Sequence, residues 1–503
     1  MALGRAFSVA VQGVAGRIVE IEAHITSGLP GVHLVGLPDA ALQESRDRVR
    51  AAIINCGNQW PMSRLTLALS PATLPKTGSV YDVALAAAVL AADRQVPIER
   101  LEKAVLLGEL ALDGRIRPVR GVLPSVIAAK QGGWPRVVVP VENLAEAALV
   151  DGIEVRGART LRQVKMWLKG TDSLEVSCVA NVESDDGGPD FADVIGQPQA
   201  RFAVEVAAAG AHHIMLTGAP GIGKTMLAQR LPGLLPPLSE EESLEVTAIH
   251  SVAGLLSPAT PLITRPPLVA PHHTSSVAAL IGGGSGMARP GAVSRAHRGV
   301  LLLDECAEIG AHALEALRTP LEEGEVRLAR RDGVAIYPAR FQLVLAANPC
   351  PCAPADPRDC VCPGAVKRRY LGKLSGPLLD RIDLRIEMHR VRKGALNADV
   401  GESTAVVRER VIRARAVAAE RWRPFGVRTN AEVSGPLLRQ HFRLDSKTMH
   451  PLRQSLDKGV LSIRGVDRTM RVAWSLADLE GRDRPNLDDV STAMGFRQIG
   501  ADR

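Results

Sequence analysis

The segment 218–225 constrains this chain more than any other part of the sequence. It reads GAPGIGKT and fits the pattern G-x-x-x-x-G-K-[ST] without a mismatch. The four residues before it are apolar and predict a short buried strand, and residues 226–231 favour a helix. Between a strand and a helix this pattern forms a phosphate-binding loop, whereas elsewhere it can be an ordinary glycine-rich turn. The sequence therefore predicts an α/β domain with a nucleotide site.

Each residue type in this loop has a defined role toward a nucleotide. Gly218, Gly221 and Gly223 let backbone N–H groups close around phosphate oxygens, and the N-terminus of the following helix adds the positive end of its dipole. Lys224 is predicted to reach the β- and γ-phosphates, and the Thr225 hydroxyl to bind Mg²⁺. The predicted cofactors are therefore ATP and Mg²⁺.

Two further apolar strands end in polar residues that suit nucleotide hydrolysis. Residues 299–305 read GVLLLDE, so Asp304 is predicted to orient Mg²⁺ or its water and Glu305 to polarise the attacking water. The strand 341–347 ends at Asn348, which we interpret as a polar sensor beside the γ-phosphate. The alternative for Asn348 is an ordinary asparagine in a turn at the end of a strand.

The length of 503 residues suggests about three domains. An acidic stretch broken by glycine and proline favours a linker, and the last part of the chain has helical spacing. The predicted units are 1–168, a linker 169–190, a nucleotide-binding domain 191–390, and a helical lid 391–503.

Composition narrows the functional classes. The net charge of +7 is compatible with nucleic acid without proving it, and an aromatic content of 3% argues against a base-stacking platform. Residues 1–10 have no long apolar core, and the longest apolar run, 83–92, is too short to span a bilayer. We therefore expect a cytoplasmic protein without a membrane partner, whose cysteines are free or metal-bound.

The sequence of the first unit, residues 1–168, predicts an α+β fold. Residues 9–11 and 18–23 favour hairpin strands, and residues 39–56 favour an amphipathic helix. The segments 71–78 and 108–116 resemble the proteolytic domain of Lon proteases, which use a serine nucleophile activated by a lysine.

Alignment with those proteases puts Val80 at the serine position and Leu123 at the lysine position, and neither side chain can perform acyl transfer. We therefore expect a Lon-like fold without peptidase activity. The alternative is a peptidase that uses Ser79 with Lys76 or Lys130.

Four segments carry a closer resemblance. Residues 265–280 (RPPLVAPHHTSSVAAL), 282–286 (GGGSG), 289–291 (RPG) and 348–352 (NPCPC) resemble the magnesium-chelatase-like AAA+ proteins, specifically the ComM/YifB family. The resemblance implies an AAA+ P-loop domain with a helical lid, preceded by a Lon-protease-like domain. It also implies a hexameric ring that acts on DNA in branch migration. The parent family takes its name from a ring subunit that drives metal insertion into a porphyrin.

The resemblance assigns two further arginines. Arg381, in the segment 375–383, corresponds to an arginine finger that touches the γ-phosphate of a neighbouring subunit, and a guanidinium suits this contact because it is always charged. The alternative is a salt bridge from Arg381 to Asp380 or Asp383. Arg464 corresponds to the second sensor, which reaches the nucleotide from the lid.

Four cysteines cluster in the sequence as C-P-C-x₇-C-V-C: Cys350, Cys352, Cys360 and Cys362. Four thiolates would complete a tetrahedral structural Zn²⁺ site. The alternative is a set of free thiols in a proline-rich loop. The neighbouring pair His272 and His273 is interpreted as ordering a loop rather than binding a metal.

Residues 325–337 alternate on both sides of Asp332-Gly333 and predict a β-hairpin. In chelatase and replicative-helicase relatives, a hairpin at this place points into the channel of the ring. Arg330 and Arg331 at its tip are predicted to hold DNA phosphates, and the glycine-rich segment 282–286 to form a second channel loop. The alternative is a surface hairpin whose arginines keep an exposed edge soluble.

The arginines of the helix predicted within 402–423 are interpreted as a solvated face or a subunit interface rather than a DNA contact. They include Arg408, Arg410, Arg413 and Arg415.

These patterns favour a ring-forming AAA+ ATPase that moves DNA. The rival is a chelatase-type motor that remodels a protein partner for metal insertion. An ATP-dependent protease is a third hypothesis, and Val80 and Leu123 argue against it.

Overall fold

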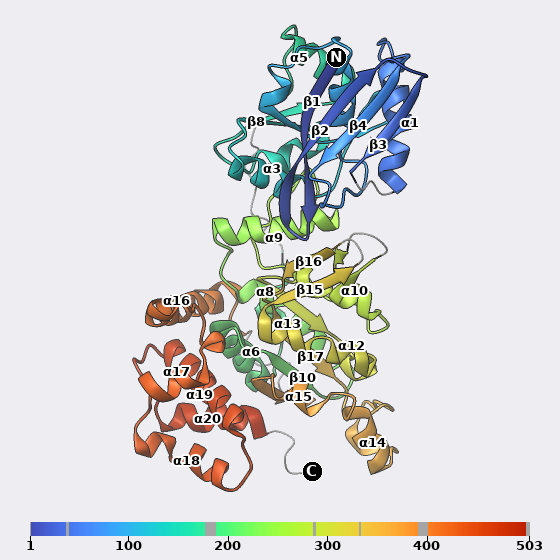
Figure 1. Cartoon of the computed structure of the whole chain (residues 1–503). Helices are drawn as coiled ribbons and strands as arrows, with labels where there is room; N and C mark the ends of the chain where they lie inside the picture. Colours follow the sequence, from blue (N-terminus) through green and yellow to red (C-terminus); the bar gives the residue numbers. More distant parts are fainter. Residues whose placement is uncertain are drawn as a thin grey trace.

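The computed structural model describes residues 2–36, 40–176, 188–284, 288–330, 333–390 and 401–498. Half of the expected linker, the end of the glycine-rich segment, Arg331 and Asp332 lie outside these ranges. In Figure 1 the N-terminal unit lies at the top, the unit that contains the P-loop lies in the middle, and the C-terminal helices lie at the lower left. The chain is thus a mixed α/β structure, as its sequence predicts.

The N-terminal unit is built on a seven-stranded mixed sheet in the order β3-β4-β2-β1-β5-β8-β9. Its predicted hairpin is confirmed, because β1 and β2 pair antiparallel along their whole length. The strands are β1 (Ala2–Gln12), β2 (Ala15–Thr26), β3 (Gly31–Val35), β4 (Arg64–Ser70), β5 (Ala104–Leu106), β8 (Arg136–Pro140) and β9 (Glu154–Ala158). The main helices are α1 (Ala40–Asn55), α2 (Asp82–Ala92), α3 (Val122–Gln131) and α5 (Leu161–Lys169).

The longest apolar run of the sequence forms the core helix α2. All eleven of its residues are buried, which explains why the run has no polar face. The helix lies against β1, where a Cβ on Gly4 would come within 2.2 Å of the Ala88 carbonyl oxygen. Glycine at position 4 therefore permits the close approach of strand and helix. No helix in the described ranges is long and apolar enough to cross a membrane.

The P-loop unit contains a five-stranded parallel sheet in the order β11-β14-β17-β10-β18. Apart from Gln342 and Thr217, its central strands consist of buried apolar residues, as expected for a sheet covered on both faces. The strands are β11 (Leu268–Val269), β14 (Val300–Leu303), β17 (Gln342–Ala347), β10 (Ile214–Thr217) and β18 (Leu384–Glu387). Because β14, β17 and β10 are parallel neighbours, the residues that follow them emerge at one edge of the sheet.

Shorter elements surround this sheet. The hairpin predicted within 325–337 is confirmed as β15 (Glu325–Arg330) paired with β16 (Gly333–Pro338). The other elements named below are α6 (Pro198–Gly210), α9 (Glu240–Ala253), β12 (Gly282–Gly283), α13 (Arg318–Glu323), α14 (Gly364–Leu371) and α15 (Gly376–Leu379).

The helix after the P-loop is shorter than the sequence suggests. A single helix was expected over 226–231, but α7 (Lys224–Ala228) ends at Ala228 and α8 (Leu231–Leu234) begins after a break. Pro232 explains the break, since it has no N–H to donate to the carbonyl of Ala228.

The C-terminal helices form the lid: α16 (Thr404–Trp422), α17 (Gly435–His441), α18 (Ser446–Asp457), α19 (Ile463–Leu479) and α20 (Leu487–Gln498). Their core is aromatic. Trp422 is fully buried, packs edge-on against Phe442 and Trp474, and donates its Nε1–H to Asn430 Oδ1 at 2.8 Å.

The interpretation of the α16 arginines as a solvated face is wrong for three of them. Arg410 bonds to the Glu205 carboxylate of α6, Arg408 donates to the Gly233 carbonyl, and Arg415 donates to the Ala208 carbonyl. The physical reason is that α16 packs across α6 and α8, so part of its charged surface faces the P-loop unit of the same chain. These arginines therefore dock the lid.

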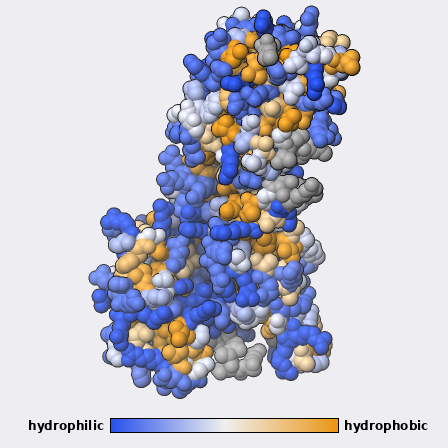
Figure 2. Space-filling model, viewed as in Figure 1, coloured by the Kyte–Doolittle hydropathy of each residue, from blue (hydrophilic) through white to orange (hydrophobic). Residues whose placement is uncertain are grey.

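The N-terminal unit contacts the P-loop unit at two places. The Gly121 amide donates to the Ser251 carbonyl, which joins the start of α3 to α9. In addition, the turn between β1 and β2 lies on β16, where a Cβ on Gly13 would come within 2.3 Å of the Ile336 carbonyl oxygen (Figure 1). The face of the molecule shown in Figure 2 is mostly hydrophilic, with separate apolar patches rather than one broad apolar band.

Candidate nucleotide-binding and hydrolysis site

The P-loop adopts a conformation that its glycines make possible. Gly218, Gly221 and Gly223 all have positive φ, at 157°, 74° and 94°. A Cβ on Gly218 would also lie 2.2 Å from the Ile222 side chain and 2.6 Å from the Met388 carbonyl oxygen. Any other residue at position 218 would therefore distort the loop.

The Lys224 ammonium group lies inside this loop. It is 8% exposed, and its Nζ donates to the carbonyls of Gly218 at 2.7 Å and Ala219 at 2.8 Å and to Asn348 Oδ1 at 3.1 Å. Burial lowers the pKa of Lys224 below its usual value, while Asp304 and Glu305 act in the opposite direction. The structure thus brings the P-loop lysine and the predicted sensor Asn348 into direct contact.

Thr225 and Asp304 form the oxygen pair predicted for Mg²⁺. The Thr225 hydroxyl donates to Asp304 Oδ2 at 2.6 Å, and Asp304 Oδ1 accepts the Glu305 amide hydrogen at 2.8 Å. A hydroxyl and a carboxylate side by side are hard oxygen ligands that fit Mg²⁺. Asp304 directly follows β14, whereas Thr225 lies in α7, which the P-loop connects to the end of β10.

Glu305 occupies an unusual backbone position. Its φ of 48° lies in the left-handed region, which turns the side chain away from the direction of β14. Its carboxylate is half exposed and pairs with His273 Nδ1 at 3.1 Å. His273 in turn stacks on His272 with ring centroids 4.1 Å apart. The two histidines were expected only to order a loop, and no sequence pattern indicates the contact between His273 and Glu305.

Arg381 is held within its own chain. Its guanidinium pairs with the Glu322 carboxylate at the end of α13 and donates to the Pro377 carbonyl. The alternative prediction for Arg381 was a salt bridge to Asp380 or Asp383, and the structure shows a salt bridge to Glu322 instead. Asp383 pairs with Arg468 at 2.7 Å. Glu322 is 59 positions away in the sequence, which is why inspection of nearby residues did not find it.

Arg381 belongs to a cluster of cations. Burial lowers the pKa of Arg381, and the charges of Arg318, Arg468 and Arg464 lower it further. Arg464 is exposed in the first turn of α19, and Arg468 donates to the Arg381 carbonyl at 3.0 Å. Arg464 is thus one of the cations whose charge acts on Arg381.

A buried polar network joins this cluster to the lid. His212 contacts Asp383 Oδ2 at 3.3 Å and the Ser475 hydroxyl at 2.7 Å. Burial alone would raise the pKa of Asp383, but Arg468 and His212 hold it well below its usual range. Because Asp383 follows α15 and Ser475 lies on α19, this network links the lid to the segment that carries Arg381.

The hairpin β15–β16 reaches the described part of the glycine-rich segment. Arg330 is exposed, and its guanidinium lies 3.2 Å from where a Cβ on Gly283 would stand. At the tip, Gly333 lies beside the Gln12 side chain of the N-terminal unit. Arg331 lies outside the described residues.

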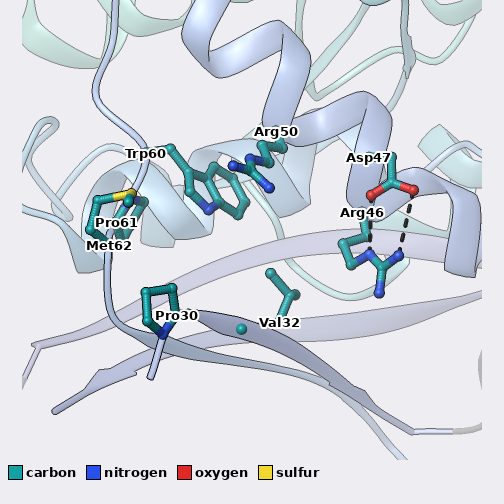
Figure 3. A pocket seen from close by; sticks show the side chains of 9 residues that line it. Pro30, Val32, Arg46, Asp47, Arg50, Trp60, Pro61 and Met62 are labelled. Atoms are coloured by element: carbon teal, nitrogen blue, oxygen red, sulfur yellow. Dashed lines mark hydrogen bonds and ion pairs between the residues drawn. The ribbon is translucent and has the colours of Figure 1, made fainter. Parts of the chain in front are cut away.

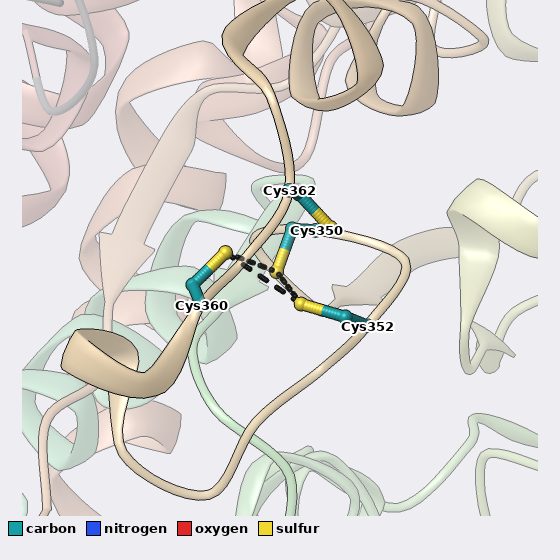
Figure 4. Close-up of side chains that lie close together, drawn as sticks. All are labelled: Cys350, Cys352, Cys360 and Cys362. Carbon is teal, nitrogen blue, oxygen red and sulfur yellow. Dashed lines mark hydrogen bonds between the residues drawn. The ribbon is translucent and has the colours of Figure 1, made fainter.

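The structure also brings the four clustered cysteines together (Figure 4). Their ligand atoms all lie within 4.8 Å of one another.

In the N-terminal unit the positions of the Lon catalytic pair hold apolar side chains, since Val80 is partly buried and Leu123 is fully buried. The Ser79 hydroxyl donates to the Glu109 carboxylate, and the buried Lys76 amine donates to the Pro71 carbonyl. Lys130 lies beside Gly152. None of the hydrogen bonds found in the described ranges joins Ser79 to a lysine.

A shallow pocket in this unit lies between β3, α1 and the segment 60–62 (Figure 3). Its lining includes Arg50, Trp60 and Met62, and Arg46 at its rim is paired with Asp47. None of the residues assigned to nucleotide chemistry lines it.

Three family descriptions match the chain. Residues 190–396 match "Magnesium chelatase, subunit ChlI", residues 21–143 match "Subunit ChlI of Mg-chelatase", and residues 401–497 match "Magnesium chelatase, subunit ChlI C-terminal". The three matches together include the P-loop, the sheet and the lid.

Several relatives are similar over the full length. The chain is 75% identical to Rv2897c of Mycobacterium tuberculosis over 503 residues, all of both chains. It is 40% identical to YifB of Escherichia coli over 501 residues, 99% of this chain and 98% of YifB. It is 38% identical to competence protein ComM of Haemophilus influenzae over 507 residues, 99% of this chain and 98% of ComM.

The similarity to Lon proteases is much shorter. Lon protease 2 of Bacillus subtilis is 35% identical over 96 residues, which are 19% of this chain and 17% of the protease. The Lon-like character of the N-terminal unit therefore stays a prediction.

Proposed function

Because this chain belongs to the ComM/YifB family of magnesium-chelatase-like AAA+ proteins, we propose that it is a ring-forming ATPase that couples ATP hydrolysis to DNA remodelling, such as branch migration in recombination or DNA uptake. The convergence of Lys224, Thr225, Asp304, Glu305 and Asn348 at one edge of the parallel sheet carries the ATPase part. The DNA part is supported by the similarity to a protein named for competence.

In the proposed reaction the P-loop binds the phosphates through its backbone amides and Lys224. Thr225 and Asp304 would hold Mg²⁺, which supplies positive charge to the β- and γ-phosphate oxygens. Glu305 orients and polarises the attacking water, which requires its carboxylate to leave His273 or to share it. Asn348, which contacts Lys224, would lie beside the γ-phosphate as a polar sensor.

The site is completed by a neighbouring subunit in this proposal. In this proposal Arg381 reaches the nucleotide of the adjacent subunit, and Arg464, at the start of α19, reaches the nucleotide from the lid. A head-to-tail interface that repeats in this way closes into a ring, and the family favours a hexamer. Arg381 must then exchange the Glu322 carboxylate for a phosphate.

DNA-stimulated ATPase activity tests the proposed function most directly. We expect single-stranded or branched DNA to raise the ATPase rate severalfold at low salt, because DNA remodelling couples the two activities. The measurement is steady-state phosphate release with and without each DNA. The Glu305→Gln variant serves as the zero-turnover control. A rate that no DNA changes would favour the rival, a motor that acts on a protein partner in the manner of a chelatase.

We assign the DNA contact, called the DNA grip below, to the two arginines at the tip of the hairpin β15–β16, Arg330 and Arg331. Replacing Arg330 and Arg331 with alanine should weaken DNA binding and reduce the slope of log affinity against log salt by about 1 for each lost phosphate contact. Basal ATPase activity should stay unchanged, because neither arginine is assigned a role in hydrolysis. Fluorescence anisotropy with labelled DNA over a salt series measures both quantities.

Arg327 offers a matched control for that experiment. It is an exposed arginine on β15 of the same hairpin, but Glu325 already neutralises it at 2.6 Å. Arg327→Ala should therefore leave the salt slope nearly unchanged. Equal losses in the control and in the double variant would show that the hairpin contributes only general charge, and the grip would then have to be elsewhere.

A further inference from the structure

The loop between β17 and α14 carries four cysteines that the proposed hydrolysis does not use. Cys350 and Cys352 flank Pro351 at the start of the loop, and Cys360 and Cys362 flank Val361 at its end. Figure 4 shows the four sulfur atoms pointing toward one common centre from the two ends of the loop. Such convergence brings together residues that are up to twelve positions apart.

The separations of the sulfur atoms fit one tetrahedral metal ion. The distances from Cys350 Sγ to Cys352 Sγ and to Cys360 Sγ are both 3.4 Å, and Cys352 Sγ lies 3.6 Å from Cys360 Sγ. The edge of a tetrahedron of thiolates around zinc is about 3.8 Å, which follows from a Zn–S bond of about 2.3 Å. The observed distances are too long for a disulfide, and these cysteines are free.

The loop has little else to hold it together. Cys350 is buried, but nearly all residues from 351 to 363 are exposed or half-exposed, and Val361 is 86% exposed. An ion pair between Arg358 and Asp356 closes only the loop's outer turn. Segments that lack an apolar core are often stabilised by a bound structural metal ion. Lys367 of α14, which bonds to Cys360, brings a positive charge to balance four thiolates.

The backbone of the loop also bends sharply next to the sulfur atoms. Ala353 donates its amide hydrogen to the Cys350 carbonyl and has a φ of 41°, in the left-handed region that residues other than glycine rarely adopt. A conformation of this kind persists where the surroundings enforce it. A metal bound by the cysteines on each side of this turn would supply that constraint.

The cluster lies between two residues of the hydrolysis site. Cys350 is two positions after Asn348, which contacts Lys224, and Cys362 directly precedes the segment that leads through α14 and α15 to Arg381. In Figure 1, α14 projects from the body at the lower right. Fixing the two ends of the loop to each other would thus fix the backbone beside Asn348.

We propose that Cys350, Cys352, Cys360 and Cys362 bind one structural zinc ion, and that this ion holds the loop so that Asn348 keeps its position beside Lys224. The ion is structural because all four ligand positions come from the protein, which leaves none for water or a substrate. Zinc fits better than calcium or magnesium because thiolates are soft ligands. The role in positioning Asn348 rests on the proposed ATPase, whereas the zinc site does not.

Metal analysis of the full-length, tag-free protein purified under reducing conditions tests the site. We expect about one zinc ion per chain. The Cys352→Ser/Cys360→Ser variant should lose the zinc, whereas Cys56→Ser, a control in the N-terminal unit, should keep it. Replacement of zinc by cobalt should give the thiolate charge-transfer bands of a tetrahedral site. Wild-type protein with no zinc and four titratable thiols would overturn the proposal, as would iron in its place.

Steady-state kinetics test the second part of the proposal. Removal of zinc by a chelator should lower kcat for ATP hydrolysis severalfold while KM for ATP changes little, because Asn348 acts on the γ-phosphate side of the site. Re-addition of zinc should restore kcat. If the protein binds zinc but removal of zinc does not change kcat, the zinc site is real and its proposed role in positioning Asn348 is wrong. If instead the wild-type protein does not hydrolyse ATP, the proposed ATPase function is wrong.

Discussion

Lys224→Ala is expected to abolish measurable ATP binding, and Glu305→Gln to keep ATP bound while slowing hydrolysis by roughly 100-fold or more. The first change removes the only ammonium group that the described residues direct into the P-loop. The second keeps the shape of the side chain but removes the carboxylate that polarises the attacking water. The two variants therefore separate binding from chemistry within one site.

Equilibrium binding of a fluorescent ATP analogue and steady-state phosphate release measure these effects. Glu308→Gln is a matched control for Glu305, because Glu308 lies three positions later in the same turn and pairs with Lys373 instead. Thermal melting should show that Lys224→Ala stays folded. Hydrolysis by Glu305→Gln at the native rate would show that another group activates the water.

Much of the nucleotide site could be predicted from the sequence because its parts are local. The P-loop is one continuous segment, and Asp304 and Asn348 directly follow mainly apolar runs, which predict buried strands. The carboxyl ends of parallel strands lie at one edge of their sheet. Residues that follow different strands are therefore expected to lie close together even when they are far apart in the sequence. The contacts between Thr225 and Asp304 and between Lys224 and Asn348 follow from this arrangement.

The partners of exposed or long side chains could not be predicted in this way. Arg381 pairs with Glu322 and Glu305 with His273, and both pairs depend on how loops from different parts of the chain pack. The same holds for Arg410, whose helical spacing suggests a solvated charge but whose partner Glu205 lies on another helix, 205 positions away. The spacing of residues in the sequence shows which of them share one face of a helix, but it does not show which other elements cover that face.

The contact between the N-terminal unit and the hairpin β15–β16 was equally hidden. Nothing in residues 9–23 or 325–337 indicates that the β1–β2 turn would lie on Ile336. The contact needs no charged or motif residue, since backbone atoms approach closely at Gly13. It places the N-terminal unit directly beside the segment to which we assign the DNA grip.

The second large effect is expected from mixing two inactive variants. Arg381→Ala keeps the P-loop but loses the finger, and Lys224→Ala keeps the finger but loses the P-loop. If Arg381 acts on the nucleotide of the neighbouring subunit, each ring with both variants contains some interfaces in which an intact P-loop meets an intact finger. In an equal random mixture about one quarter of the interfaces have this composition, so about one quarter of the wild-type ATPase rate should return.

The matched control mixes Arg381→Ala with the double variant Lys224→Ala/Arg381→Ala. These rings contain intact P-loops but no finger, so the rate should stay at the level of Arg381→Ala alone. Native mass spectrometry shows whether mixed oligomers form in both samples. An absence of rescue in mixed oligomers of the first pair would place the action of Arg381 within its own chain.

If Arg381 acts on the neighbouring subunit, its pair with Glu322 must open first. In the single chain the Glu322 carboxylate neutralises Arg381, so the finger is not available to a phosphate until this pair opens. Glu322 lies at the end of α13, directly before β15, and therefore any movement of the hairpin reaches the pair through a few residues. Glu322→Gln should then raise the rate of mixed and wild-type-like rings at low nucleotide, because the amide holds the guanidinium less strongly than the carboxylate does. A lower rate in Glu322→Gln would mean instead that Glu322 aims Arg381 at its target.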